Sequence, residues 1–218
     1  MRVEIWSDIV CPWCYIGKRR FETALAKFEH ADEVEVIWKS FQLNPDQPKG
    51  QREPVAEHLA AKYGVSVDEA RAMNDRVKGI AAEEGLVYDF DRYTMVNTFD
   101  AHRLTHLAKE RGLGAELHER FLRGQLVEGE VLEDHDTLIR LAAEVGIPEA
   151  DARRVLESDV YANEVNADID ELRGLGGSGV PFFVIDRRYG VSGAQPAEVF
   201  LNALETAYRD SVPAGVSR

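Results

Sequence analysis

The stretch Asp8-Ile9-Val10-Cys11-Pro12-Trp13-Cys14-Tyr15-Ile16-Gly17 decides the fold, and it contains both cysteines of the chain. A short apolar, β-prone segment at residues 2–6 precedes it, and an apolar helical period follows it. This pattern predicts a strand, a turn and then a helix over residues 12–29 that begins at the cysteine pair. Residues three positions apart share one face of a helix, so the two thiols can form and break a disulfide with little backbone movement.

The position of each cysteine predicts its role. Cys11 is expected at the helix N-terminus, where unpaired N–H groups and the helix dipole favour a thiolate. Pro12 then occupies the first helical position, where its missing N–H costs nothing. Cys14 lies one turn further along. The spacing therefore predicts a redox-active dithiol with Cys11 as the nucleophile and Cys14 as the resolving thiol.

Three other interpretations of the pair are open but weaker. Half of a zinc site would need further ligands, and the chain has no second cysteine pair. A structural disulfide that closes so small a loop would stabilise the fold little. Two unrelated buried thiols would behave simply as small core residues.

Length and charge narrow the class of protein. The chain has 218 residues, which fits one large domain or one domain with a big insertion. A formal net charge of −13 argues against a nucleic-acid partner, which calls for clustered Lys and Arg. No apolar stretch is long enough for a membrane span, and residues 1–5 do not begin a secretory signal. A cytoplasmic location is therefore predicted, without a membrane partner, and there a CxxC pair is more often catalytic or metal-binding than structural.

The rest of the chain separates into a helical block between two β-containing ends. Residues 34–41 predict a second strand, which gives a right-handed βαβ unit. Residues 180–186 and 189–193 predict a β-hairpin, which a helix over 196–208 follows. Between these ends no convincing strand is found, and helices are predicted at 66–84 (with Ser66 and Glu69 as a capping box), from an Asn97 cap to Arg111, and at 115–127, 135–145, 148–157 and 161–173.

Several of these motifs resemble those of a known family. Cys11-Pro12-Trp13-Cys14 after a first strand, with Gly179-Val180-Pro181-Phe182-Phe183-Val184 opening a late one, resembles the DsbA family of thioredoxin-fold oxidoreductases. The FrnE-like branch is closer still, and it is related to 2-hydroxychromene-2-carboxylate isomerases and kappa-class glutathione transferases. The further motifs that carry this resemblance are Phe41-Gln42-Leu43-Asn44-Pro45, Asn97-Thr98-Phe99-Asp100-Ala101-His102-Arg103 and Ser192-Gly193-Ala194-Gln195-Pro196.

The resemblance implies an α/β thioredoxin fold with a large all-helical insertion between its second and third strands. The thioredoxin-like domain would comprise residues 1–48 and 176–209, the insertion residues 49–175, and a C-terminal tail residues 210–218. The resemblance also implies a cis Val180–Pro181 peptide beside the cysteine pair, which makes Pro181 part of the catalytic site. Such a loop would free the Val180 backbone to pair with an extended peptide or with glutathione.

Candidate substrate-binding residues lie close to these motifs. They are Pro12, Trp13, Val180, Asn44 and His102. Trp13 could contact substrate or form an exposed hydrophobic lip, and Asn44 could line the cleft or serve only the turn. His102 could face the cysteine pair across the cleft or be structural. Asp8 could accept the Cys14 proton, but a turn residue before the helix is the preferred interpretation.

Three functions are compatible with the sequence. A thiol–disulfide oxidoreductase is preferred, because isomerase and glutathione-transferase relatives typically carry Ser in place of Cys11 and lack the second thiol. Its partner would be a dithiol or disulfide peptide or a small thiol, with glutathione as a co-substrate. A glutathione-dependent isomerase acting on a small aromatic or polyketide-like compound, or a chaperone, are the alternatives. No bound cofactor and no metal are expected, and the direction of electron flow and the choice between monomer and homodimer stay open.

Overall fold

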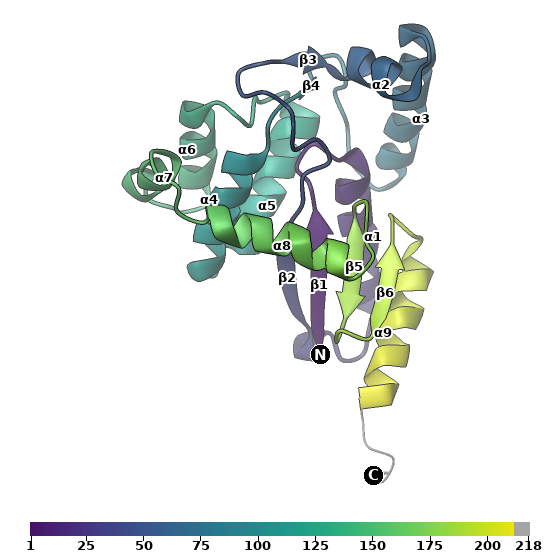
Figure 1. Ribbon diagram of the computed structural model, residues 1–218. Coiled ribbons are helices and arrows are strands. Elements are labelled where there is room, and N and C mark those ends of the chain that lie inside the picture. The colour runs from purple at the N-terminus through teal and green to yellow at the C-terminus, as the bar shows by residue number, and fades with distance from the viewer. Residues whose placement is uncertain (212–218) are drawn as a thin grey trace.

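The computed structural model describes residues 1–211. At its centre is a four-stranded sheet in the order β2-β1-β5-β6 (Figure 1). The strands are β1 (Arg2–Ser7), β2 (Glu35–Ser40), β5 (Phe182–Ile185) and β6 (Tyr189–Ser192). β1 is parallel to β2 and antiparallel to β5, and β5 is antiparallel to β6. The two ends of the chain thus share one sheet, in the predicted β-α-β and β-β-α order.

Helices cover both faces of this sheet. Val3 and Ile5 of β1 pack with α1 (Pro12–Lys27) and α9 (Ala197–Ser211) on one face. Trp6 points to the opposite face, because side chains alternate along a strand. There it packs with α8 (Ala162–Gly174), which crosses the front of the sheet in Figure 1. Trp6 Nε1 also donates a hydrogen bond of 2.7 Å to a backbone carbonyl of α8, so α8 is fastened to the sheet.

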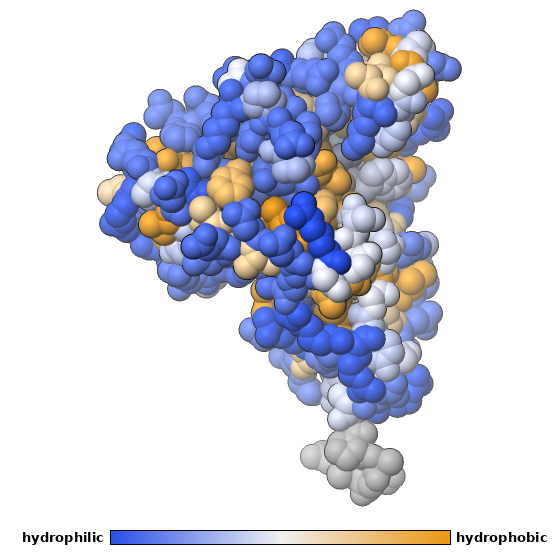
Figure 2. All heavy atoms as spheres, viewed as in Figure 1, coloured by the Kyte–Doolittle hydropathy of each residue, from blue (hydrophilic) through white to orange (hydrophobic). Residues whose placement is uncertain are grey.

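The remaining helices form a block above and beside the sheet (Figure 1). An apolar core joins the helices on one side of this block, and Ile9, just after β1, belongs to the same core. Hydrophilic side chains cover most of the face in Figure 2, while hydrophobic ones gather at the free end of α2 and α3. The elements are α2 (Val55–Tyr63), α3 (Val67–Glu83), α4 (Phe99–Glu110), α5 (Gly114–Arg123), a π-helical segment (Gly124–Glu128), α6 (His135–Glu144) and α7 (Glu149–Leu156), with a short 3₁₀ turn (Ala31–Glu33) before β2.

Most predicted helices are confirmed within a few residues. The capping box of α3 is present, with the Ser66 hydroxyl accepting from the Glu69 amide and the Glu69 carboxylate accepting from the Ser66 amide. The helix expected from an Asn97 cap begins later, at Phe99, with Thr98 in the cap position. The Asn97 side chain still accepts the Phe99 amide at 3.0 Å, because a short amide readily closes such a turn.

Two features of the insertion were not predicted. The sequence pattern predicted no helix at α2 and no strand in this region. The structure has α2 and a small antiparallel pair of β3 (Glu53–Pro54) and β4 (Thr94–Met95). Each strand has two residues, and Pro54 argues against a strand, so only the tertiary pairing produces them.

The structure adds detail at two predicted bounds, the end of the insertion and the start of the C-terminal tail. The predicted boundary at residue 175 places α8 in the insertion, although α8 packs on the sheet. α9 extends to Ser211, so the first two residues of the predicted tail are helical. Residues 212–218 of that tail lie outside the described residues. None of the helices within residues 1–211 is long and apolar enough to cross a membrane.

Candidate functional site: the Cys11–Cys14 pair and its pocket

The cysteine pair occupies the start of α1, as the sequence predicts. Cys11 is the cap residue, with extended backbone angles of φ −97° and ψ 109°, and Pro12 begins the helix. The Cys11 side chain makes no capping hydrogen bond, so its sulfur is available for other contacts. Both cysteines are free thiols and both are buried. The structure therefore presents a reduced dithiol at a helix N-terminus, where a thiolate is favoured.

The loop before β5 lies against Cys11. The Val180–Pro181 peptide bond is cis. Cys11 Sγ donates to the Val180 carbonyl oxygen at 3.6 Å, which joins residues far apart in the chain. The Gly193 amide donates to the Pro181 carbonyl at 2.8 Å and holds the loop from the hairpin side. The two sequence motifs at opposite ends of the chain thus form one site.

Gly17 allows α1 to approach this loop closely. A methyl group at Gly17 would lie 2.9 Å from Cγ of Pro181 and 3.5 Å from the backbone of Ala194. Real side chains essentially never show such a short contact. The absence of a side chain at this helix position therefore sets the distance between the cysteine helix and the Val180–Pro181 loop.

The two thiols have different surroundings. Burial raises the pKa of Cys14 well above its usual value, and a hydrogen bond with Cys11 raises it further. The backbone of Asp8 and the hydroxyl of Ser7 act in the opposite direction and lower it. Cys11, in contrast, lines a pocket that reaches the surface. This asymmetry suits a pair in which Cys11 meets the substrate and Cys14 reacts from behind it.

Two tyrosines of the irregular stretch between α3 and α4 hold the motif in place. The Tyr88 hydroxyl donates to the Pro12 carbonyl at 2.7 Å. The Tyr93 hydroxyl donates to the Val10 carbonyl, and both rings are buried. Burial raises the pKa of both phenols, so both remain protonated donors. The insertion is thereby hydrogen-bonded directly to the backbone on either side of Cys11.

A mostly apolar pocket of about 160 Å³ opens beside Cys11. Its walls come from the cysteine motif, the end of β2, the helices α2 and α3, and the segment that leads to β4. The polar groups on its wall are Asn44, His58, Lys62 and Asn74. Its other lining residues are Val10, Cys11, Pro12, Trp13, Leu43, Val55, Leu59, Tyr63, Met73, Val77, Phe90, Tyr93 and Met95.

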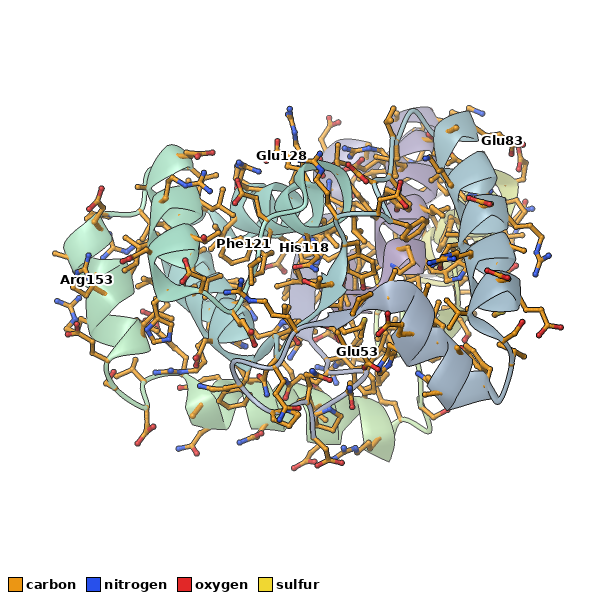
Figure 3. All side chains as sticks on the ribbon, turned by 90° about the horizontal axis from the view of Figure 1, so that it is seen from above. Glu53, Glu83, His118, Phe121, Glu128 and Arg153 are labelled. Atoms are coloured by element: carbon orange, nitrogen blue, oxygen red, sulfur yellow. The ribbon has the colours of Figure 1, made fainter. Side chains whose placement is uncertain are left out.

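Internal hydrogen bonds orient part of this wall. Asn44 Nδ2 donates to Gln47 Oε1 at 2.9 Å, so this amide lines the pocket and also serves its own turn. His58 Nδ1 lies 2.9 Å from a carboxylate oxygen of Glu53. Glu53 belongs to β3, directly before α2, and lies near the centre of the view in Figure 3. Lys62 extends over the ring of Tyr63, with its ammonium 5.9 Å from the ring centroid. The rim of the pocket thus carries a cation beside apolar walls.

The structure brings most of the predicted site residues together, but His102 is an exception. Pro12, Trp13 and Asn44 line the pocket, and Val180 contacts Cys11. His102 is buried and does not line the pocket. Its Nε2 lies 3.2 Å from Asp8 Oδ1, so the imidazole is held behind the turn by a carboxylate.

Asp8 itself is a buried turn residue, as preferred from the sequence. One carboxylate oxygen faces His102, and the other accepts the Leu43 amide at 2.7 Å. Its backbone carbonyl accepts the Cys11 amide at 3.0 Å, which closes the turn before α1. Asp8 therefore links β1, the end of β2 and α4 at the base of the site.

Two groups of site residues were not predicted from the sequence. The pocket wall on α2 and α3 was not predicted, although the i, i+4 spacings of Val55 with Leu59 and of Met73 with Val77 were a usable signal. The sequence also predicted neither Ser7 nor His118 as a site residue. No sequence signal connects His118 with the cysteine pair, because the two are brought together only by packing.

Comparisons with known proteins agree with this geometry. A family model described as a DSBA-like thioredoxin domain matches residues 2–205. Among solved structures, a probable DsbA oxidoreductase from Streptomyces coelicolor matches 100% of this chain and 94% of its own, with 49% identity and a TM-score of 0.94. The predicted resemblance to the DsbA family is thereby confirmed.

Two more distant structures share the fold. The cytosolic disulfide reductase DsbM from Pseudomonas aeruginosa, solved with GSH, has a TM-score of 0.65 and 20% identity, over 96% of this chain and 100% of that one. A 2-hydroxychromene-2-carboxylate isomerase has a TM-score of 0.69 and 13% identity, over 96% of this chain and 97% of that one. Identities this low show the fold alone. Together with the matched family model, the sheet, the insertion and the cysteine motif show that the chain belongs to the DsbA-like thioredoxin domain family.

Proposed function

We propose that this protein is a thiol–disulfide oxidoreductase in which Cys11 is the nucleophile and Cys14 the resolving thiol. The Cys11 thiolate attacks one sulfur of a substrate disulfide, and the other substrate sulfur leaves as a thiolate. Cys14 then attacks the Cys11 sulfur of this mixed disulfide and releases the second substrate thiol. The enzyme pair is oxidised by two electrons and the substrate disulfide is reduced. The reverse sequence oxidises a dithiol, and the relative reduction potentials decide the direction.

One observation carries this proposal: Cys11 lies between an open pocket and the Val180 backbone carbonyl, with a second thiol one helical turn behind it. The pocket gives a substrate sulfur access to Cys11. The contact of Cys11 with the Val180 carbonyl supports a role for this loop backbone in binding a group attached to Cys11. Cys14 is buried and can meet only a sulfur attached at Cys11. A dithiol in this arrangement supports exchange through a mixed disulfide.

The pocket also supports a choice of substrate class. Its volume of about 160 Å³ is similar to a cavity of about 150 Å³ that admits a benzene ring. It would therefore hold one apolar or aromatic side chain next to the reacting sulfur. Trp13 is 38% exposed at the pocket and offers a flat apolar surface to the rest of a peptide. We infer that the substrate is a peptide disulfide or dithiol, or a small thiol, with an apolar group close to its sulfur.

Glutathione is the co-substrate that we propose for returning the pair to its dithiol form. Lys62 at the rim would favour an anionic thiol such as glutathione. The DsbM structure, which has a similar fold, was solved with GSH. A cytoplasmic location, proposed from the sequence, would supply this thiol in excess. Two glutathione molecules would become one oxidised glutathione for each enzyme disulfide reduced.

Trapping of the mixed disulfide tests the mechanism. The Cys14→Ala variant, treated with oxidised glutathione, should gain one glutathione on Cys11 and keep it, because the resolving thiol is missing. The Cys11→Ser variant is the matched control and should gain none. Insulin reduction should be lost in both variants. Undiminished insulin reduction by Cys11→Ser would contradict the assignment of the nucleophile.

The same variants distinguish disulfide exchange from the isomerase alternative. Glutathione-dependent isomerisation needs no second thiol at the helix, so such an activity should survive Cys14→Ala. Disulfide exchange that releases free product thiols should not survive it. An isomerase activity on a small aromatic compound that persists in Cys14→Ala, without insulin reduction by the wild type, would replace our proposal.

A further inference from the structure

A buried hydrogen-bonded pair lies behind the resolving thiol and has no part in the mechanism described above. Ser7 ends β1, and His118 projects from α5 toward the sheet, in the interior of the molecule (Figure 3). Ser7 Oγ and His118 Nε2 are 2.9 Å apart. Ser7 is fully buried and His118 is 2% exposed. The imidazole is stacked on the Trp38 ring, with 3.9 Å between centroids, so its orientation is set from one side by packing.

The other nitrogen of this imidazole indicates which tautomer is present. Within the described residues, His118 Nδ1 is buried and has no hydrogen-bond partner. A buried N–H without a partner is rarer and costlier than a buried acceptor without one. The ring is therefore best satisfied with its hydrogen on Nε2 and a lone pair on Nδ1. His118 Nε2–H then donates to Ser7 Oγ, which leaves the Ser7 hydroxyl hydrogen free to donate elsewhere.

The charge state of His118 agrees with this tautomer. Burial lowers the pKa of His118 well below its usual value, and the nearby Lys18 and His102 lower it further. The charge of Glu119, the next residue on the same helix, raises this pKa, but less than burial lowers it. The ring is neutral near pH 7. It can donate one hydrogen bond, but it is a poor acceptor for a proton.

The groups that face Cys14 leave a role for the Ser7 hydroxyl. Cys11 and burial favour the protonated thiol, whereas hydrogen bonds from the Asp8 backbone and the Ser7 hydroxyl favour the thiolate. The buried phenols of Tyr88 and Tyr93 also lie within electrostatic reach of the thiol. The Asp8 carboxylate is already engaged by His102 and the Leu43 amide. The Ser7 side chain lies on the same face of β1 as Val3 and Ile5, which α1 covers. Cys14 shares a face of α1 with Lys18, whose ammonium lies 5.9 Å from the centre of the Trp38 ring on which His118 is stacked. The geometry thus sets the Ser7–His118 pair beside Cys14.

We propose that His118 and Ser7 are positioning residues for the resolving step: His118 orients the Ser7 hydroxyl so that it donates a hydrogen bond to the Cys14 sulfur as that sulfur becomes a thiolate. This inference rests on the proposed disulfide exchange and names two further residues in it. Cys14 forms the bond to the Cys11 sulfur, and the bond from Cys11 to the substrate sulfur breaks. The departing substrate thiolate takes the proton that Cys14 loses. Ser7 and His118 keep their own protons throughout.

The pKa of Cys14 provides a direct test. It is measured in a Cys11→Ser background from the ¹³Cβ chemical shift of labelled cysteine, which does not require access to the buried thiol. Ser7→Ala and His118→Phe should each raise this pKa by about one unit, the size expected for a lost hydrogen bond to a charged group. Combining the two substitutions should raise it no further, because both break the same chain. His118→Gln, which can place an amide donor near the former Nε2, should restore most of the original value.

One control tests whether the effect is specific to Ser7, and a second variant guards against a failure of His118→Phe to fold. The Ser40 hydroxyl also meets a buried histidine, with 3.2 Å between its Oγ and His106 Nε2, on the neighbouring strand. Ser40→Ala should leave the pKa of Cys14 unchanged. If His118→Phe fails to fold, Ser7→Ala still decides the question, because it removes only one hydroxyl group. An unchanged pKa in folded Ser7→Ala would overturn the proposal.

Kinetics in the wild-type dithiol background give a second readout. A rise of about one pKa unit lowers the thiolate fraction about tenfold, and the greater nucleophilicity recovers about half of this on a logarithmic scale. Release of glutathione from the Cys11 mixed disulfide should therefore slow about threefold in Ser7→Ala. Formation of that mixed disulfide should keep its wild-type rate. A Cys14→Ala variant that forms no mixed disulfide with oxidised glutathione would refute the proposed function, whereas normal formation and resolution in Ser7→Ala would refute only this inference.

Discussion

Replacement of Gly17 by alanine tests how the cysteine helix and the Val180–Pro181 loop are held together. The added methyl group would lie 2.9 Å from Cγ of Pro181 and 3.5 Å from both Cα and Cβ of Ala194. Neither neighbour is the end of a long, flexible side chain. The helix or the loop must therefore shift by several tenths of an ångström.

Two opposing effects determine the size of the change. Alanine is a better helix former than glycine by about 1 kcal/mol in a helix interior. Overpacking of a well-packed site costs about 1–3 kcal/mol. Gly79 in α3 supplies the matched control, because a methyl group there would meet nothing within 4 Å. Gly79→Ala should stabilise the protein by about 1 kcal/mol, and the difference between the two variants should be about 1–3 kcal/mol.

Urea unfolding of both variants, followed by circular dichroism, measures this difference. The Gly17→Ala variant should also form the Cys11 mixed disulfide more slowly, because the helix that carries Cys11 moves relative to Val180. If Gly17→Ala were as stable as Gly79→Ala and reacted at the wild-type rate, the close approach of α1 to the loop would not be what sets the site geometry.

Three further substitutions test separate contacts. Tyr88→Phe removes the hydrogen bond from the insertion to the cysteine motif and should lower the free energy of unfolding by about 1 kcal/mol, measured by urea titration. Ser66→Ala removes the capping box of α3 and should cost about 1 kcal/mol in the same measurement; an unchanged midpoint would show that packing alone holds this helix. Although burial raises the pKa of Asp168, hydrogen bonds from His106 and Lys39 lower it from 3.8 to about 2. The stability that this carboxylate contributes is therefore present above pH 3.8 and lost as pH falls toward 2, by about 2 kcal/mol. Asp168→Asn should remove that part of the acid dependence of unfolding, and an identical pH profile would contradict the role of this network.

Short-range patterns predicted the parts of the fold that depend on local chemistry. Segments rich in apolar, β-branched and aromatic residues predicted the four strands of the central sheet. The serine–glutamate spacing at residues 66 and 69 predicted a helix start that the structure confirms. The two-residue strands β3 and β4 escaped prediction, because a pairing that short has no pattern of its own. The helix α2 escaped as well, although the apolar i, i+4 spacing of Val55 and Leu59 was available.

The sequence by itself determined the reactive chemistry: two cysteines three residues apart, after a strand and before a helix, with a late Val180-Pro181 motif that a family resemblance connected to them. The tertiary structure alone decided what surrounds that chemistry. In the folded chain His102 contacts Asp8 and does not line the pocket, α2 and α3 form part of the pocket wall, and His118 lies within hydrogen-bond distance of Ser7. The physical reason is the range of the interactions. Caps, turns and periodicity act within a few residues, whereas burial and buried hydrogen bonds join residues more than ninety positions apart.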